Sequence, residues 1–333
     1  MTGAGHVLEV EGLRVWYATP KGRLVAVDGI DLVVEAGECV GLVGESGSGK
    51  SSLARAILGL LPEGAGDEGE LRVAGEPVIG ASPSELRALR GEKVALIFQE
   101  PMSRLDPLMR VEDQFVEMIR AHRRDVTRDE ARRMCHTTLA SLGIPPLRAR
   151  QYPHEFSGGM RQRIMIGLAI VLEPRLVVAD EPTTALDTLV QAQILEILRS
   201  LADDLGIAVL LITHNIGAVA ETCDRVAVMY AAKVVEVGSA QQVLGSPGHP
   251  YTQGLIASVI NLDTETLSSI PGSPPDLADP PPGCRFHPRC PHVMDVCRSV
   301  EPPAVAVGDG TVACWLHVPE ASRPAPAAFA PGA

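Results

Sequence analysis

Gly44-Glu45-Ser46-Gly47-Ser48-Gly49-Lys50-Ser51 follows a short β-type run, Glu38 to Val43, and precedes a segment with helical periodicity, Lys50 to Leu61. The stretch fits the phosphate-loop pattern G-x-x-x-x-G-K-[ST] and stands between a strand and a helix, as that pattern requires. Glycines let backbone N–H groups wrap a polyphosphate, Lys50 can reach its terminal phosphates, and the Ser51 hydroxyl can ligate Mg²⁺. The order of strand, loop and helix predicts a nucleotide-binding α/β core.

A second part of the predicted site lies where an apolar strand ends in two carboxylates, at Val177-Val178-Ala179-Asp180-Glu181-Pro182. Side chains alternate along a strand, so the two carboxylates need not have the same task. We assign Asp180 to Mg²⁺ through water and Glu181 to the attacking water as general base. The alternative is a solvated acidic strand end without a catalytic role.

A third motif, Phe156-Ser157-Gly158-Gly159-Met160-Arg161-Gln162-Arg163, lies between these two segments. A Ser-Gly-Gly turn that opens a helix presents a hydroxyl and free backbone N–H groups, which together form an anion site. The chain therefore has two phosphate-binding helix starts, and the economical use of both is to hold one nucleotide between two copies of the protein. With these three motifs the sequence resembles the ATP-binding subunits of ABC transporters.

The resemblance implies roles for further residues. Gln99, after the strand Val94 to Phe98, joins the core to a helical subdomain and touches Mg²⁺ or the attacking water. His214, at the end of the strand from Ala208, is the switch histidine that contacts the γ-phosphate. Asp187 closes a loop that contacts the opposite site of the dimer, and Tyr17 stacks on adenine. The alternative for Tyr17 is an aromatic side chain that fills the edge of the core.

The predicted site is thus complete. The catalytic residues are Glu181, His214 and Gln99, and the magnesium ligands are Ser51, Gln99 and Asp180. The nucleotide contacts are Tyr17, Gly44, Glu45, Ser46, Gly47, Ser48, Gly49, Lys50, Ser51, Ser52, Ser157, Gly158, Gly159 and Asp187.

Three further segments resemble the peptide-importer branch of this family, over about residues 6 to 318. They are Phe98 to Pro107, His249 to Leu255 and Gly283 to Pro291. The resemblance implies an ATPase that powers peptide import, with a nickel or other small-solute importer of the same branch as the alternative. It also implies a second, related ATP-binding subunit, two transmembrane permease subunits and an extracytoplasmic substrate-binding protein. The chain is then expected at the cytoplasmic face of the cell membrane, as a peripheral protein.

The pattern of the chain predicts an α/β fold with a mostly parallel sheet, antiparallel strands near the N-terminus, a helical insert and a loop-rich C-terminal extension. Residues 1–258 would form the nucleotide-binding domain, with the helical subdomain at about 100–172. Its predicted helices are Val111 to His122, Arg128 to Leu142 and Ser157 to Leu172. Residues 259–320 would form the extension, and residues 321–333 a disordered tail.

Four of the seven cysteines, Cys284, Cys290, Cys297 and Cys314, crowd this extension. Five, six and sixteen residues separate them, which is neither the paired spacing of common zinc modules nor a ferredoxin run. Disulfides, buried free thiols, zinc and an iron–sulfur cluster remain open, and the resemblance favours a 4Fe–4S cluster. Because the surrounding chain is rich in proline and poor in apolar residues, we expect a metal centre to supply the missing core.

Composition narrows the function classes. The net charge of −12 argues against nucleic-acid binding, whose footprint is a basic surface. No apolar run reaches the length of a membrane helix, and the N-terminus lacks the pattern of a signal peptide, so we expect a soluble, cytoplasmic chain. DNA-repair ATPases with a similar signature have long insertions, whereas only 58 positions separate Gln99 from Ser157 here. Translation-type ABC proteins need two ATPase halves, and this chain has one.

Overall fold

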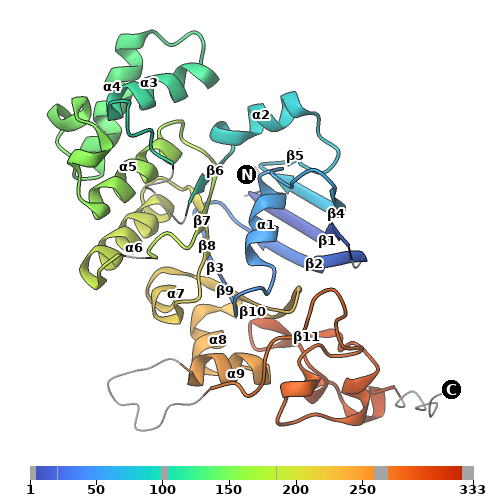
Figure 1. The fold of residues 1–333 in the computed structure, drawn as a ribbon. Helices are drawn as coiled ribbons and strands as arrows, with labels where there is room; N and C mark the ends of the chain where they lie inside the picture. Colours follow the sequence, from blue (N-terminus) through green and yellow to red (C-terminus); the bar gives the residue numbers. More distant parts are fainter. Residues whose placement is uncertain (1–4, 21, 99–103, 185, 259–268, 325–333) are drawn as a thin grey trace.

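The computed structural model describes residues 5–20, 22–98, 104–184, 186–258 and 269–324, and Figure 1 shows its fold. Among these residues, eight strands form one sheet in the order β11-β12-β10-β9-β3-β8-β7-β6. Its central part is parallel and consists of β9 (Arg225–Tyr230), β3 (Cys39–Val43), β8 (Ala208–Ile212), β7 (Leu176–Asp180) and β6 (Val94–Ile97). The predicted α/β core with a mostly parallel sheet is confirmed.

The parallel part of this sheet is buried on both faces, as its continuous apolar strands predict. Along β3, Val40 and Leu42 belong to one apolar cluster, which also contains side chains of α1 (Lys50–Ile57). Cys39 and Val43 alternate into a second cluster with α6 (Thr188–Asp203) and α7 (Ile216–Thr222). The strand that precedes the phosphate loop is therefore buried on one face by the cluster that includes α1 and on the other by the cluster that includes α6 and α7.

The N-terminal part of the chain forms an antiparallel sheet that lies beside α1 (Figure 1). Its strand order is β2-β1-β4-β5. Its strands are β1 (Leu8–Thr19), β2 (Gly22–Val34), β4 (Ala65–Val73) and β5 (Glu76–Pro77). The first strand continues through Trp16 and Tyr17, because Tyr17 and Ala18 still pair with Leu24 and Arg23. The predicted antiparallel N-terminal strands are confirmed.

The helical part of the chain lies away from the antiparallel sheet in Figure 1. It consists of α3 (Val111–His122), α4 (Arg128–Ser141), two short 3₁₀ turns (Pro146–Arg150 and Pro153–Glu155) and α5 (Gly158–Ile170). Its apolar side chains, with Phe115 and Ile164 fully buried, form a cluster of their own. The helix α2 (Pro83–Glu92) precedes this part and was not predicted. Gln99, the expected joint, lies outside the described residues.

One predicted helix end is wrong. The segment from Lys50 to Leu61 is helical only to Ile57. Gly59 follows with φ +58°, and the Leu60 N–H turns back to the Arg55 carbonyl at 2.8 Å. A left-handed glycine of this kind terminates a helix because it redirects the chain and satisfies the last carbonyls.

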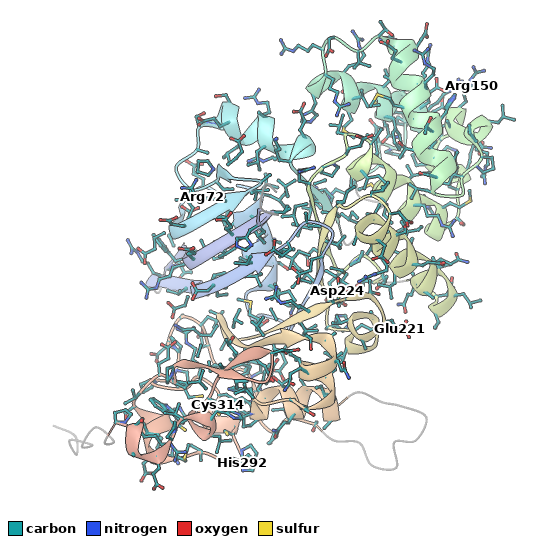
Figure 2. All side chains as sticks on the ribbon, turned by 180° about the vertical axis from the view of Figure 1, so that it is seen from behind. Arg72, Arg150, Glu221, Asp224, His292 and Cys314 are labelled. Atoms are coloured by element: carbon teal, nitrogen blue, oxygen red, sulfur yellow. The ribbon has the colours of Figure 1, made fainter. Side chains whose placement is uncertain are left out.

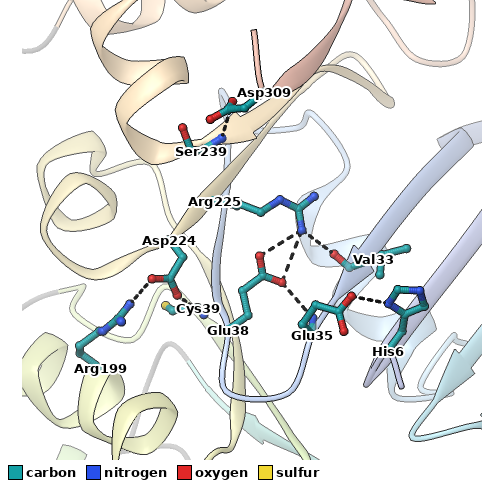
Figure 3. Close-up of polar contacts among 10 residues, drawn as sticks. All are labelled: His6, Val33, Glu35, Glu38, Cys39, Arg199, Asp224, Arg225, Ser239 and Asp309. Carbon is teal, nitrogen blue, oxygen red and sulfur yellow. Dashed lines mark hydrogen bonds and ion pairs between the residues drawn. The ribbon is translucent and has the colours of Figure 1, made fainter. Parts of the chain in front are cut away.

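Ion pairs anchor the start of β3 to its neighbours (Figure 3). Arg225 donates to the Val33 carbonyl at 3.2 Å and pairs with Glu38 at 3.1 Å. Asp224 accepts the Cys39 N–H at 2.9 Å and a hydrogen bond from Arg199 of α6 at 2.7 Å. These contacts connect β3 to the antiparallel sheet and to α6. They therefore fix the position of β3 and of the phosphate loop that follows it.

The chain after the parallel strands runs through β10 (Lys233–Ser239), α8 (Ala240–Gly245) and α9 (Pro250–Ala257) to the C-terminal extension, here residues 269–324. In the extension, the hairpin of β11 (Ala304–Val307) and β12 (Gly310–Ala313) joins the main sheet, since β12 pairs with β10. Four 3₁₀ turns complete it: His287–Arg289, Asp295–Arg298, Trp315–His317 and Glu320–Ser322.

The expectation that this extension lacks an apolar core is wrong. Val296, Cys297, Trp315 and Val318 are buried together in a small cluster. The Trp315 indole N–H donates to the Val300 carbonyl at 3.0 Å, so its polar atom is satisfied. No helix in the described parts of the chain has the length and apolarity needed to cross a bilayer.

Candidate nucleotide site

The ends of the parallel strands bring many of the predicted site residues to one cavity of about 780 Å³. The phosphate loop follows β3, Asp180 ends β7 with Glu181 directly after it, and His214 follows β8. These three strands lie side by side in the sheet, in the order β3-β8-β7. Ligands of open α/β sheets bind at such carboxyl ends. The lining residues are Tyr17, Leu24, Ala26, Ser46, Gly47, Gly49, Lys50, Ser51, Ser52, Asp180, Glu181, Thr184, His214 and Leu277.

Two glycines of the phosphate loop lie too close to neighbouring strands for any side chain. A Cβ on Gly44 would meet the Met229 carbonyl oxygen at 2.1 Å, and one on Gly49 would meet that of Ala26 at 2.0 Å. Both residues have positive φ, +154° and +110°. Gly49 is also the N-cap of α1, and no described side chain caps this helix start, which leaves its first N–H groups for an anion.

Lys50 points back into the loop. Its ammonium donates to the carbonyls of Gly44 at 2.7 Å and Glu45 at 3.0 Å. Burial lowers the pKa of Lys50, while the nearby carboxylates of Glu181, Asp180 and Glu45 act in the opposite direction. Burial raises the pKa of Asp180, and a hydrogen bond with Ser51 partly offsets this. The loop thus places a buried cation beside acidic oxygens.

Glu181 is held in a strained position. Its backbone φ is +50°, a value that residues other than glycine rarely adopt. Such strained backbone often marks a functional site. One carboxylate oxygen lies 2.7 Å from His214 Nδ1 and accepts the His214 N–H at 3.1 Å. The other accepts the hydroxyls of Thr184 and Thr213, both at 3.3 Å. The carboxylate is therefore oriented from both sides, next to an exposed histidine.

Tyr17 and Trp16 point to different sides of β1, as strand alternation requires. Tyr17 lines the cavity, and its hydroxyl donates to Ser52 of α1 at 3.0 Å. Trp16 packs instead on Gly66, beneath the guanidinium of Arg23. Of the two aromatic residues, only Tyr17 is placed to contact a base.

The Ser-Gly-Gly motif does not reach this cavity. Ser157 caps α5 by accepting the Met160 N–H at 3.4 Å, and Asp187 caps α6 by accepting the Val190 N–H at 3.0 Å. The two helix starts are packed together, since a Cβ on Gly159 would meet Val190 at 2.6 Å. Ser157, Gly158, Gly159 and Asp187 thus form a separate corner of the molecule, as expected if they serve a site on another chain.

Comparison with known proteins agrees with this geometry. The ABC transporter family matches residues 27–184, and the C-terminal region of oligopeptide/dipeptide transporters matches residues 235–297. The chain is 44% identical to the oligopeptide transport ATP-binding protein OppD of Salmonella typhimurium over 322 residues, 95% of this chain and 96% of the relative. The chain belongs to the ATP-binding proteins of oligopeptide and dipeptide ABC transporters.

Further relatives of this ABC ATP-binding protein support the assignment. The dipeptide transport ATP-binding protein DppD of Bacillus subtilis is 44% identical, covering 93% of this chain and 95% of the relative. Among solved structures, cbiO1 of Clostridium perfringens, part of the ABC transporter complex cbiONQ, matches with a TM-score of 0.62 and 30% identity over 72% of this chain and 91% of its own. A dimeric post-hydrolysis state of the ATP-binding cassette MJ0796, bound to ADP and Pi, matches with the same TM-score at 26% identity over 70% and 98%.

The four cysteines of the extension gather around one small cavity of about 10 Å³, together with His249, His287 and His292. Figure 2 shows Cys314 and His292 in this part of the molecule. Burial raises the pKa of Cys284 to about 12 and of Cys314 to about 11. Within the described ranges, however, no three His, Cys, Asp or Glu side chains are arranged to hold a metal ion. The expected cluster is therefore not supported by this geometry, and all four cysteines are free.

Sequence reasoning missed several contacts of the ABC ATP-binding protein. Thr184 lies just before Asp187 in sequence and Thr213 directly precedes His214, but nothing in their spacing shows where their hydroxyls point. Leu277 and Arg289 of the extension reach the nucleotide site from far along the chain. Arg289 lies within a segment that resembles the family's extension, yet no sequence signal connects it to the phosphate loop.

Two substitutions in the phosphate loop separate backbone strain from steric clash. Gly47→Ala introduces a side chain at φ +79° with nothing within 4 Å, so we expect a cost of about 1–2 kcal/mol in unfolding free energy. Gly49→Ala adds a collision with the Ala26 carbonyl to similar strain, and we expect at least twice that loss. Urea unfolding of both variants measures the difference. Equal losses would show that the loop does not pack as described.

Proposed function

We propose that this chain is the ATP-hydrolysing subunit that powers peptide import through an ABC transporter. One observation carries the proposal: the phosphate loop, Glu181 and His214 line a single cavity at the ends of adjacent parallel strands. The relatives are named as ATP-binding proteins of oligopeptide or dipeptide transport, which supports peptides as the cargo. A nickel or other small-solute importer is the alternative within this branch, because cargo selection would lie in other subunits.

The proposed contacts with ATP follow from the geometry. The open start of α1 and the glycines before it would receive the phosphates, and Lys50 would exchange its bonds to loop carbonyls for phosphate oxygens. Tyr17 is the proposed contact of the adenine. Ser51 and Asp180 share a hydrogen bond and offer the hard oxygen ligands that Mg²⁺ prefers, so they would hold it, with Gln99 as a further ligand. Bound Mg²⁺ would neutralise charge on the phosphates.

Glu181 is the proposed general base. Its carboxylate is within hydrogen-bond reach of His214 and two threonine hydroxyls, which keep it oriented toward the cavity. A water between Glu181 and the terminal phosphate would lose its proton to the carboxylate as it attacks. His214, largely exposed at the cavity mouth, would contact the γ-phosphate. Gln99 is proposed to position the water or the metal.

Two chains are proposed to complete each site. Ser157, Gly158, Gly159 and Asp187 lie together but outside this chain's own cavity, so they would close the cavity of a second, related ATP-binding subunit. The dimeric state of a solved cassette with the same fold supports this arrangement. Two permease subunits in the membrane and an extracytoplasmic substrate-binding protein would complete the transporter, with this chain on the cytoplasmic face. A DNA-repair role is disfavoured by the acidic net charge.

A metal centre in the extension remains a separate proposal. Its support is the gathering of Cys284, Cys290, Cys297 and Cys314 around one cavity. Burial raises the pKa of Cys284, so its free thiolate is disfavoured, and a bound metal would favour the thiolate form. An iron–sulfur cluster is the proposed occupant and zinc the alternative, in either case with a structural role.

Glu181→Gln should lower ATP turnover by about 10²–10⁴-fold, because an amide cannot accept the proton of the attacking water. ATP should still bind, since the phosphate loop is unchanged, and the variant should accumulate as an ATP-bound closed dimer. Phosphate release and equilibrium ATP binding measure the two effects. Glu221→Gln, at an exposed position of α7 (Figure 2), is the matched control and should keep wild-type turnover. Turnover of Glu181→Gln within a few-fold of wild type would contradict the assignment.

Turnover should depend on assembly. The isolated chain should hydrolyse ATP slowly, because its own Ser-Gly-Gly motif does not line its cavity. The corresponding motif of a partner ATPase is needed to complete the site. Activity per chain should rise when the partner ATPase and the permeases are added. Sedimentation velocity establishes the oligomeric state of each sample. Full activity in a strictly monomeric sample would rule out the composite site.

Anaerobically purified protein should contain iron and show an oxygen-sensitive absorption band. Replacing any of the four extension cysteines with Ser should bleach the band and leave ATP binding intact. Cys135→Ser, in the buried core of α4, is the control and should keep the metal content. Elemental analysis decides among the outcomes: zinc without iron would keep the metal and refute the cluster, and four free thiols without metal would refute both.

A further inference from the structure

Arg289 of the C-terminal extension forms a two-pronged ion pair with the phosphate loop. Its Nη1 lies 2.7 Å from Glu45 Oε2, and its Nη2 lies 3.0 Å from Glu45 Oε1. The Arg289 side chain is only 5% exposed, although 244 positions separate the two residues in sequence. Bidentate pairs of this kind fix geometry as well as charge. Glu45 is the second residue of the phosphate loop, so the contact acts directly on the nucleotide site.

The backbone of Glu45 is held at the same time. Its N–H donates to the hydroxyl of Tyr251, a fully buried residue of α9, at 2.8 Å. Its carbonyl accepts the Lys50 ammonium at 3.0 Å and the Ser48 N–H at 3.2 Å. The position of Glu45 therefore influences both the curvature of the loop and the lysine that would reach the phosphates.

Arg289 uses all five of its N–H donors. Besides the two bonds to Glu45, Nη1 donates to the Tyr230 hydroxyl at 3.3 Å, Nη2 to the Ile270 carbonyl at 3.3 Å, and Nε to the Pro271 carbonyl at 2.8 Å. The segment that begins at Ile270 continues to Leu277, which lines the nucleotide cavity. One arginine thus connects the phosphate loop, the end of β9 and the extension.

The charge of Glu45 gives this contact a consequence for anion binding. A carboxylate on the phosphate loop repels a polyphosphate, and Arg289, which is not among the residues that line the cavity, neutralises it. Removing the arginine would leave an uncompensated, partly buried anion close to the phosphates. Lysine would restore the charge but not the planar fork.

We propose that Arg289 is a positioning residue for ATP: through Glu45, the C-terminal extension holds the phosphate loop in the shape and charge state that binds polyphosphate. The inference rests on the proposed function, since it concerns the affinity of the same site. The extension is then part of the nucleotide site, and detaching it weakens ATP binding without touching Glu181 or His214.

Equilibrium titration of the full-length chain with a fluorescent ATP analogue and Mg²⁺ tests the proposal. Arg289→Gln should raise the Kd about tenfold, which corresponds to about 1.4 kcal/mol. Arg289→Lys should lie between this variant and wild type. The double variant Glu45→Gln/Arg289→Gln should bind within about threefold of wild type, because the unpaired anion is removed as well. In the assembled transporter, the KM for ATP of Arg289→Gln should rise while kcat stays near the wild-type value.

Arg285→Gln is the matched control. Arg285 also belongs to the extension and anchors it, through Asp28 and the Ala231 carbonyl, but it does not contact Glu45. This variant should lower the thermal midpoint measured by circular dichroism and change the Kd less than twofold.

The outcomes are distinguishable. Failure of the wild-type chain to bind ATP would overturn the proposed function. Normal ATP binding by wild type and by a folded Arg289→Gln variant would overturn this inference alone. A double variant that binds as weakly as Arg289→Gln would show that the arginine only stabilises the fold. If Arg289→Gln does not fold, Arg289→Lys and the double variant measure the same contact.

Discussion

Close packing of the phosphate loop between two strand carbonyls is the constraint on which the rest of the site depends. Gly44 lies against the Met229 carbonyl and Gly49 against that of Ala26, with no room for a side chain at either place. The loop from β3 to α1 therefore needs glycine at both positions to follow this path. The first residues of α1 line the cavity. Asp180, Glu181 and His214 meet this helix start because β8 lies beside β3 and β7 lies beside β8.

Strain and charge concentrate at the same place. Glu181 adopts a left-handed conformation, Lys50 is buried among carboxylates, and burial raises the pKa of Asp180. Each of these features costs stability in the absence of a ligand, and the apolar clusters on both faces of the sheet offset the cost. A bound polyphosphate with its metal would relieve part of this electrostatic frustration. The backbone strain at Glu181 and the buried charges of Lys50 and Asp180 thus lie where a ligand is expected.

The C-terminal extension is integrated into the nucleotide-binding core rather than appended to it. Its hairpin continues the main sheet, its arginines reach the core at Asp28 and Glu45, and Leu277 lines the nucleotide cavity. Nucleotide affinity and the integrity of the extension are therefore coupled in our proposal. The cysteines lie next to this contact in the chain, since Cys290 follows Arg289 directly.

The sequence by itself determined the parallel core, most helix ends and the place of the predicted phosphate loop between a strand and a helix, because these follow from local periodicity and from the spacing of glycines and lysine. It also indicated two separate anion sites. It failed at the end of α1, where one left-handed glycine stops the helix, and at the extension, where strand pairing and a small apolar cluster replace the expected lack of a core. Only the tertiary structure decided that Thr184 and Thr213 orient Glu181 and that Arg289 pairs with Glu45. These contacts join side chains from distant parts of the chain, and their geometry depends on how sheets and loops pack rather than on any local pattern.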